Sequence, residues 1–333
     1  MCVPDFLVSH RCDLGPSGHL AGALKRQDSQ GGDSIMRLAK VRRPASSPNS
    51  PGPGRSHHEQ TSLAPELRSA ALQPRWIQKH LLLSAISLIS RFRSRSGSVL
   101  MLSGGLCVKY GRRLDLVEAQ TMIFISRCSN VPVPKVYMAF EHKGYTYILM
   151  ERIRGTPLGR GWFQRSASSR LKVLASLRDA IIELRTLGTK SSAISSLNGG
   201  SLYDPRMPCI EGRFGPFRSI EEFHEYLRDG IQPHDDHLPG LKRLIDLHGE
   251  QWEGPTFTHG DLSSLNIIAR GDRVVGIVDW ETAGWYPTYW EYTTACQVNP
   301  QNAFWSQEID HFLTPMPKAL EMEQLRQRYF GDV

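Results

Sequence analysis

The sequence lacks the features that mark secreted, membrane-spanning or zinc-binding proteins. Its six cysteines are scattered, without a C-x-x-C pair or a Cys/His cluster at zinc spacing, so we expect reduced thiols rather than a disulfide framework. The nearest approach to a membrane span, Leu81–Ile89, is short and interrupted by serines. The first residues lack a charged segment followed by an apolar core. A cytoplasmic location with no membrane partner is therefore the expectation.

The chain also lacks a strongly basic body. Its formal net charge is +7, but residues 1–75 hold ten Lys and Arg against six Asp and Glu and contribute +4 of it. The remaining +3 is spread over 258 residues, and no interleaving of basic and aromatic residues accompanies it. We therefore expect no nucleic-acid partner.

Residues 1–75 are rich in Ser, Pro, Gly and Arg. Such a composition buries too little apolar surface to offset chain entropy, so it predicts a disordered tail. A dispensable tail is the simpler interpretation. The alternative is a regulatory tail that carries Ser-Pro phosphorylation sites or a basic nuclear signal.

Residues 76–155 are expected to form a small mixed β/α lobe. The pattern predicts a helix over 76–89, then two strands, Val99–Leu102 and Leu106–Tyr110, joined by a glycine turn. A helix is expected to begin at Asp115 and end near Arg127, because two prolines follow at 132 and 134. Strands over 135–140 and 145–150 then form a hairpin, and 151–155 is a hinge.

Residues 156–333 are expected to form a larger, mainly helical lobe. Leucines and isoleucines between Leu171 and Leu187 recur at helical spacing and predict an amphipathic helix. The Gly-, Ser- and Pro-rich residues 191–215 predict a long surface loop. Further helices are expected from Ser219 and over 307–313 and 317–330. The expected fold class is therefore α+β, with two lobes of unequal size.

The residues that point to chemistry lie between 256 and 281. Asp261 and Asn266 are five positions apart, and Asp279 follows a short apolar run. The spacing His259-x-Asp261-x-x-x-x-Asn266 is typical of the catalytic loop of kinases. In phosphoryl transfer one Asp orients the attacking hydroxyl, while an Asn and a second Asp hold magnesium, which prefers oxygen ligands. The pattern thus predicts a kinase-fold phosphotransferase.

Several segments resemble the aminoglycoside phosphotransferase/choline kinase-like family, especially its large fungal branch, and they occur in that family's order. They are CVKYG at 107–111, VEAQTM at 117–122, VPVPKVY at 131–137, ILMER at 148–152, FTHGDL at 257–262, NII at 266–268, IVDWETAGWYP at 277–287 and YWEY at 289–292. The resemblance covers roughly residues 95–333. It implies a bilobal protein kinase-like fold that binds ATP between the lobes, and it leaves the acceptor open.

The resemblance also implies roles for individual residues. Asp261 would be the catalytic base, Asn266 and Asp279 the Mg²⁺ ligands, and Lys109 the lysine on the α- and β-phosphates, paired with Glu118. The hinge residues whose backbone would bind adenine are Met150, Glu151 and Ile153.

Several of these residues have a simpler interpretation. Asp261 could bond backbone amides of its loop, and Asn266 could stabilise a turn. The spacing Asp115-x-x-Glu118 is also that of a capping box, and the hinge could be a plain linker. His259 is interpreted as a structural histidine that holds the loop, in preference to an acid–base group.

Two departures from the kinase pattern affect the expected function. The segment Ser90–Ser98 contains one glycine and no G-x-G-x-x-G motif, although a phosphate-covering loop needs close backbone approach. This favours an alternative hypothesis, a pseudokinase that binds a nucleotide or a partner with little or no transfer. Trp280 and Glu281 replace Phe-Gly, and no Ala-Pro-Glu segment follows, which argues against a protein substrate.

The expected acceptor is therefore a hydroxyl group of a small molecule. Acidic residues cluster in the second lobe, at positions 221, 222, 225, 229, 235 and 236. They could attract a cationic amine if they lined the cleft, but a solvated helix face is the favoured interpretation. The aromatic residues between Trp285 and Tyr292 are likewise interpreted as packing rather than as a ligand-binding wall. The sequence leaves the oligomeric state open.

Overall fold

The computed structural model describes residues 74–92, 95, 97–189, 191–207 and 212–331. The predicted tail over 1–75 lies outside the described residues, apart from Pro74 and Arg75. Within the described part of the chain, no helix combines the length and apolarity needed to cross a membrane.

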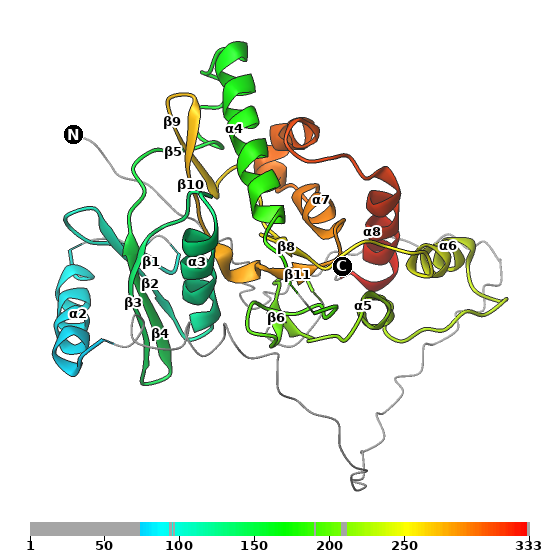
Figure 1. Ribbon diagram of the computed structural model, residues 1–333, viewed down its shortest axis with the longest axis horizontal. Coiled ribbons are helices and arrows are strands. Elements are labelled where there is room, and N and C mark those ends of the chain that lie inside the picture. The colour runs from blue at the N-terminus through cyan, green and yellow to red at the C-terminus, as the bar shows by residue number, and fades with distance from the viewer. Residues whose placement is uncertain (1–73, 93–94, 96, 190, 208–211, 332–333) are drawn as a thin grey trace, which may run out of the picture. The chain divides into compact units, whose positions relative to one another are not determined.

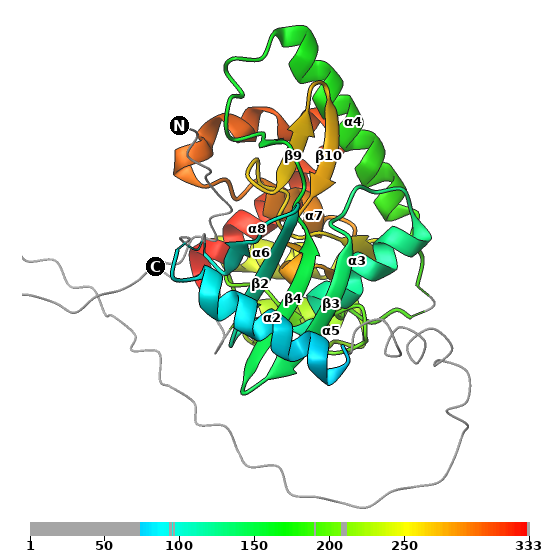
Figure 2. The same ribbon diagram turned by 90° about the vertical axis from the view of Figure 1, so that its left-hand side faces the viewer.

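The first part of the chain is an antiparallel sheet with a helix on each face (Figures 1 and 2). The sheet has four strands in the order β1-β2-β4-β3. Its elements are α2 (Trp76–Ile89), β1 (Val99–Met101), β2 (Leu106–Gly111), α3 (Leu116–Cys128), β3 (Val136–His142) and β4 (Tyr145–Glu151). They agree with the predicted small mixed lobe.

Side chains of β2 alternate between the two faces of this sheet. Val108 packs with Leu82 and Ile86 of α2, while Cys107 belongs to the core cluster that contains α3. Because the side-chain period of a strand is two, Lys109 lies on the same face as Cys107. The sequence pattern of β2 thus directs one lysine towards α3.

Helix α3 begins where Asp115 caps it and ends before two prolines. The Asp115 carboxylate accepts a hydrogen bond from the Val117 N–H at 2.9 Å, which satisfies one of the free amides at the helix start. Glu118 therefore occupies the first turn of the helix. The short link from β2 to α3 brings this residue close to Lys109.

The second part of the chain is mainly helical. Its elements are β5 (Thr156–Pro157), α4 (Ala167–Arg185), β6 (Leu202–Tyr203), β7 (Arg213–Phe214), α5 (Ile220–Leu227), α6 (Pro239–His248), β8 (Thr256–Thr258), β9 (Ile267–Arg270), β10 (Arg273–Ile277), η2 (Trp280–Thr282), β11 (Gly284–Tyr286), α7 (Trp290–Ala295), η3 (Pro300–Gln307), η4 (Ile309–His311) and α8 (Pro317–Phe330). The α+β class expected from the sequence is confirmed.

The expectation of a surface loop over 191–215 is wrong for its described residues. Strands β6 and β7 pair within it, and Leu202 and Phe214 are buried in the second core cluster. Asp204 is also buried completely. The composition misled because short strands with few apolar residues gain their burial from distant partners, such as Tyr286 and Phe223 in the same cluster.

The β9–β10 hairpin positions the polar residues of the central motif. Ile267 pairs with Ile277, and Arg270 pairs with Arg273 across the turn. Asn266 precedes β9 and Asp279 follows β10, so both lie at the open end of the hairpin. Val278 N–H donates to the Asn266 carbonyl at 2.9 Å and extends the pairing of the hairpin. His259, which follows β8, lies beside this end of the hairpin, because its Nε2 is 3.0 Å from the Val278 carbonyl.

Two buried histidines join α5, α6 and the segment before α7. The rings of His224 and His248 stack with centroids 4.4 Å apart. His224 Nδ1 donates to the His248 carbonyl at 3.0 Å, so its Nε2 accepts from the Tyr289 hydroxyl at 2.7 Å. Burial lowers the pKa of His224 to about 4 and the pKa of His248 to about 2, the latter with help from the His224 ring.

We therefore expect these two histidines to make the folded protein less stable in mild acid. The unfolded chain binds protons at these histidines near pH 6.5 while the folded chain does not, so the free energy of unfolding falls as the pH drops below that value. Between pH 7.5 and 5.5 each histidine contributes a loss of about 1.4 kcal/mol. Urea unfolding of wild type and His248→Phe at both pH values measures this change in the free energy of unfolding. The variant should lose about half as much stability as wild type from these two sites.

A surface variant provides the matched control. His234 is exposed, so His234→Phe replaces a histidine without disturbing the buried pair. Equal pH dependence in wild type and His248→Phe would show that the buried pair does not cause the acid sensitivity.

Candidate functional site

Asp261, Asn266 and Asp279 form one connected group at the open end of the β9–β10 hairpin. Asn266 Nδ2 donates to Asp261 Oδ2 at 2.8 Å and to the Asp261 carbonyl at 3.0 Å. The Asn266 carbonyl accepts from Val278 N–H, so Asp279 follows one residue later. Since the amide nitrogen of Asn266 is used on Asp261, its Oδ1 is the atom left to meet a cation.

Asp279 has an unusual backbone conformation. Its φ of 66° and ψ of 65° are in the left-handed region, which non-glycine residues rarely adopt. Such conformations persist where the surroundings impose them, and they concentrate at functional sites. Here the Asp279 carboxylate lies 2.6 Å from Lys109 Nζ, so the conformation directs this side chain towards the sheet lobe.

Lys109 is the centre of a buried charge network. Its Nζ lies 2.9 Å from Glu118, 2.6 Å from Asp279 and 3.1 Å from Glu281. The Lys109 and Glu118 side chains are only 5% and 2% exposed, whereas Glu281 is 30% exposed. The Glu118 carboxylate thus contacts Lys109. The N-terminal cap of α3 is the hydrogen bond from Val117 N–H to the Asp115 carboxylate. The network joins β2 and α3 to the end of β10.

The network carries more negative than positive charge. Burial alone would lower the pKa of Lys109, but Asp279, Glu118 and Glu281 raise it well above its usual value. Burial raises the pKa of Glu118, although Lys109 opposes this. Three carboxylates share one ammonium group, so the site favours a further cation.

Asp261 lies next to this network. Partial burial raises the pKa of its carboxyl group to about 6; the Arg206 guanidinium lowers it and the Asp279 carboxylate raises it. A carboxyl group with this pKa is mostly ionised at neutral pH and is close to the range suited to proton acceptance. Asp261 can therefore act as a base.

His259 is held on both sides of its ring. Nδ1 accepts from the Asp261 N–H at 3.1 Å, so Nε2 carries the proton and donates to the Val278 carbonyl at 3.0 Å. Burial lowers the pKa of His259, which keeps the ring neutral. These contacts use both nitrogens inside the protein and favour a structural role.

The loop at 259–261 is clamped by side chains from later elements. The Glu291 carboxylate accepts from the N–H groups of His259 and Gly260 at 2.7 and 3.0 Å. Thr282 Oγ1 donates to the His259 carbonyl at 2.9 Å. Gly260 has a φ of 81°, and a Cβ there would lie 3.0 Å from the Thr282 carbonyl oxygen, so only glycine fits this turn.

The predicted hinge residues lie in the last positions of β4 and just after it. Lys109 pairs with Ile148, and Met150 lies two residues further along the strand with its side chain buried. The Glu151 N–H donates to the Lys135 carbonyl at 2.8 Å. Gly276 leaves room for the Ile153 side chain, because a Cβ there would lie 2.8 Å from Ile153 Cγ2. Met150 and Glu151 thus end β4, and Ile153 lies against Gly276 of β10.

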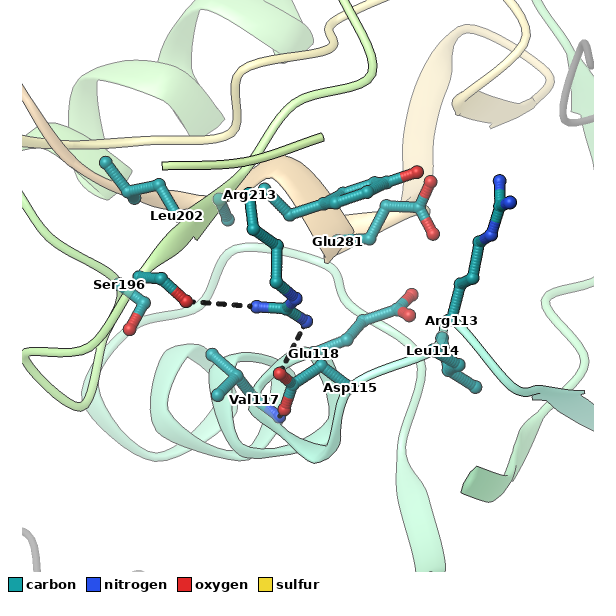
Figure 3. A pocket seen from close by; sticks show the side chains of 12 residues that line it. Arg113, Leu114, Asp115, Val117, Glu118, Ser196, Leu202, Arg213 and Glu281 are labelled. Atoms are coloured by element: carbon teal, nitrogen blue, oxygen red, sulfur yellow. Dashed lines mark hydrogen bonds and ion pairs between the residues drawn. The ribbon is translucent and has the colours of Figure 1, made fainter. Parts of the chain in front are cut away.

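A small cavity reaches the network from the side of α3 (Figure 3). Glu118 and Glu281 line it together with the start of α3, Ser196 and residues 201–203. Arg213 spans part of it, with Nη2 2.6 Å from Asp115 and Nη1 3.4 Å from Ser201 Oγ. Groups of both charges line this cavity, so it has no clear preference for a charged ligand.

Sequence reasoning missed four residues of this site. Glu281 was noted only as a replacement for glycine, and Glu291 only as part of a motif. Asp204 and Arg206 fall in the segment expected to be a surface loop. The Asp-Pro dipeptide at 204–205 signals a turn, but nothing local shows that Arg206 reaches Gly260, 54 residues away.

The acidic residues of the second lobe and the aromatic residues from Trp285 to Tyr292 agree with the simpler interpretations given for them from the sequence. Among the acidic residues of the second lobe, Glu221, Glu225, Asp229, Asp235 and Asp236 are exposed. The aromatic residues from Trp285 to Tyr292 are buried in the core. The structure thus confirms a solvated face and a packed aromatic cluster.

Comparisons with known proteins bear on the family and the fold of this chain. A sequence profile described as the Phosphotransferase enzyme family matches residues 112–327, more than half of the chain. A comparison with curated proteins gave no match. Among solved structures, the chain is similar to a thermostable mutant of aminoglycoside phosphotransferase APH(4)-Ia in ternary complex with ADP and hygromycin B. The TM-score is 0.50 and the sequence identity is 16%, over 73% of this chain and 87% of that chain.

The chain is also similar to the gentamicin complex of APH(2'')-IIa, with a TM-score of 0.49 and 12% identity over 77% of this chain and 87% of that chain. At these identities only the fold is shared, and the likeness at a TM-score of 0.50 supports it. The predicted bilobal protein kinase-like fold is confirmed.

The clamp at Glu291 leads to a testable expectation for stability. Glu291→Gln keeps the size of the side chain but replaces one accepting oxygen with an NH₂ group that faces a backbone N–H. We expect the free energy of unfolding to fall by about 1–3 kcal/mol, because a buried donor loses its partner. Urea unfolding at pH 7.5 measures the change. Glu321→Gln, at an exposed pair with Arg243, serves as the control and should leave stability unchanged, and an equal effect of the two substitutions would contradict the clamp.

Proposed function

Since the chain belongs to the phosphotransferase enzyme family, we propose that it is an ATP- and magnesium-dependent kinase for small molecules. It would transfer the γ-phosphate of ATP to a hydroxyl group of the acceptor. The observation that carries the proposal is the convergence of Asp261, Asn266 and Asp279 beside the Lys109 network. In this proposal residues 76–155 bind the nucleotide and residues 156–333 supply the catalytic loop.

The donor set fits a magnesium ion. Asn266 Oδ1 and the Asp279 carboxylate are hard oxygen ligands, and magnesium usually completes its shell with phosphates and water. The excess of carboxylates around Lys109 favours the ion electrostatically. When bound, magnesium would neutralise charge on the phosphates. Glu281 is a further oxygen donor close to Asp279, because both contact Lys109 Nζ.

The protein's own residues would position the reactants. Asp261 would accept the hydrogen bond of the acceptor hydroxyl and then its proton, as the hydroxyl oxygen bonds to the γ-phosphorus and the bond to the ADP oxygen breaks. Lys109 would donate to the α- and β-phosphates. The Glu151 carbonyl and the Ile153 N–H would bind the edge of adenine. Positioning and electrostatics supply most of the acceleration in reactions of this class.

The acceptor would be a small molecule with a free hydroxyl group. A solved structure with the same fold contains ADP and hygromycin B, which puts aminoglycosides into the first panel of acceptors. A screen with labelled ATP across hydroxylated amines, amino-sugars and aminoglycosides would identify the acceptor.

With an acceptor in hand, Asp261→Ala tests the catalytic role. We expect kcat to fall by about 10²–10⁴-fold, the usual contribution of a general base, with little change in thermal unfolding. Asp272→Ala provides a matched control, because Asp272 lies exposed at the turn of the same hairpin and bonds Ser169. Retained turnover in purified Asp261→Ala would refute the assignment.

A second candidate function is a pseudokinase that binds a nucleotide or a partner. Protein kinases cover the phosphates with a glycine-rich loop, but here helix α2 leads into β1 through a segment whose one glycine is Gly97. In that segment the Arg95 guanidinium lies 3.9 Å from the centre of the Tyr110 ring and donates to the Tyr110 carbonyl at 3.0 Å. Arg95 is thus bound to β2 rather than directed into the cleft.

Nucleotide binding and hydrolysis separate the two candidates. For an active kinase we expect ATP with magnesium to raise the unfolding temperature, because a ligand that binds the folded state stabilises it. Asp279→Asn should reduce this magnesium-dependent shift. A shift without ATP hydrolysis or transfer would favour the pseudokinase, and no shift at millimolar ATP would exclude nucleotide binding of useful strength.

A further inference from the structure

A buried salt bridge lies behind the loop that carries Asp261. The Asp204 carboxylate, 1% exposed, receives Arg206 Nη2 at 2.6 Å on one oxygen and Arg206 Nε at 2.8 Å on the other. The second oxygen also accepts from the Arg206 N–H at 2.9 Å. Two parallel hydrogen bonds hold the guanidinium plane in one orientation.

The same guanidinium reaches two distant segments. Nη2 donates to the Gly260 carbonyl, and Nη1 donates to the Thr294 carbonyl of α7 at 3.4 Å. Arg206 is separated from these residues by 54 and 88 positions. It therefore joins the segment after β6, the catalytic loop and α7 at one point.

The bond to Gly260 controls the peptide unit before Asp261. The Gly260 carbonyl and the Asp261 N–H belong to one planar peptide group. Arg206 holds its oxygen end, and His259 Nδ1 accepts from its N–H end at 3.1 Å. With both ends held, the group cannot rotate without breaking a hydrogen bond, and its rotation would swing the Asp261 side chain.

Stability alone does not account for this arrangement. A buried ion pair repays its desolvation poorly, and an apolar pair of similar volume often serves a fold as well. A directional group is needed where a carbonyl must be held in one orientation. We propose that Arg206, held by Asp204, is a positioning residue that sets the direction in which Asp261 presents its carboxylate to the acceptor hydroxyl. This inference rests on the proposed role of Asp261.

Arg206→Lys tests the proposal while keeping a positive charge beside Asp204. Lysine is a point charge without the planar fork of arginine, so it cannot hold both Asp204 oxygens and the Gly260 carbonyl. We expect kcat to fall by about 10²-fold, the usual effect of a displacement of about 1 Å at a reacting group. The KM for ATP should change by less than about twofold, because the nucleotide contacts remain.

Two further variants separate positioning from folding. Arg243→Lys is the matched control, because Arg243 also forms a two-bond pair, with Glu321 at 2.9 and 3.0 Å, and that pair is exposed. It should leave kcat unchanged. The double variant Asp204→Asn/Arg206→Met removes one buried charge of each sign, and it should fold and show the same loss of kcat as Arg206→Lys. Thermal unfolding and circular dichroism give the folded fraction used to normalise kcat.

Amide hydrogen exchange gives a readout that does not depend on turnover. In wild type the Asp261 N–H should be protected, and in both Arg206 variants it should exchange about tenfold faster, since local opening becomes easier. If wild type neither phosphorylates any acceptor nor hydrolyses ATP, the proposed function fails, and exchange at Asp261 alone decides the positioning. Unchanged kcat per folded molecule together with unchanged exchange in Arg206→Lys would overturn the inference.

Discussion

The buried ammonium group of Lys109 is the interaction on which the rest of the structure depends. It lies in the sheet lobe, and its three carboxylate partners come from α3, from the end of β10 and from η2. A buried ammonium without partners would cost several kcal/mol, so α3 and the end of β10 must lie where their carboxylates reach it. The same contact joins the two lobes and gathers carboxylates whose negative charge the metal ion of the proposed function would balance. Fold and chemistry thus share one constraint.

The loop at 259–261 is held in a different way, by hydrogen bonds to its backbone. Glu291 accepts from two of its N–H groups, Thr282 and Arg206 donate to two of its carbonyls, and His259 accepts from a third N–H. Nearly every polar group of the turn has a partner in the protein, as buried backbone requires. The Asp261 side chain extends from a support that is already rigid. Such preorganisation is what positioning catalysis needs.

Local patterns in the sequence were sufficient for much of the fold. The strand β2 and the helix that begins at Asp115 each depend on neighbouring residues, and both elements formed as predicted. The segment over 191–215 did not follow its composition, because pairing of β6 with β7 and contacts with distant aromatic residues bury it. The composition of a segment indicates how favourably it interacts with water, whereas its burial depends on which distant elements pack against it.

The same distinction applies to the site. The sequence by itself determined the group formed by Asp261, Asn266 and Asp279, because a short loop and a tight hairpin hold them within nineteen residues. The family resemblance, together with the nine positions between them, indicated that Lys109 pairs with Glu118. Only the tertiary structure decided that Glu281 and Asp279 meet Lys109, more than 160 residues earlier in the chain, and that Arg206 meets Gly260. Short connections limit where residues can go, but contacts between distant segments depend on how whole elements pack.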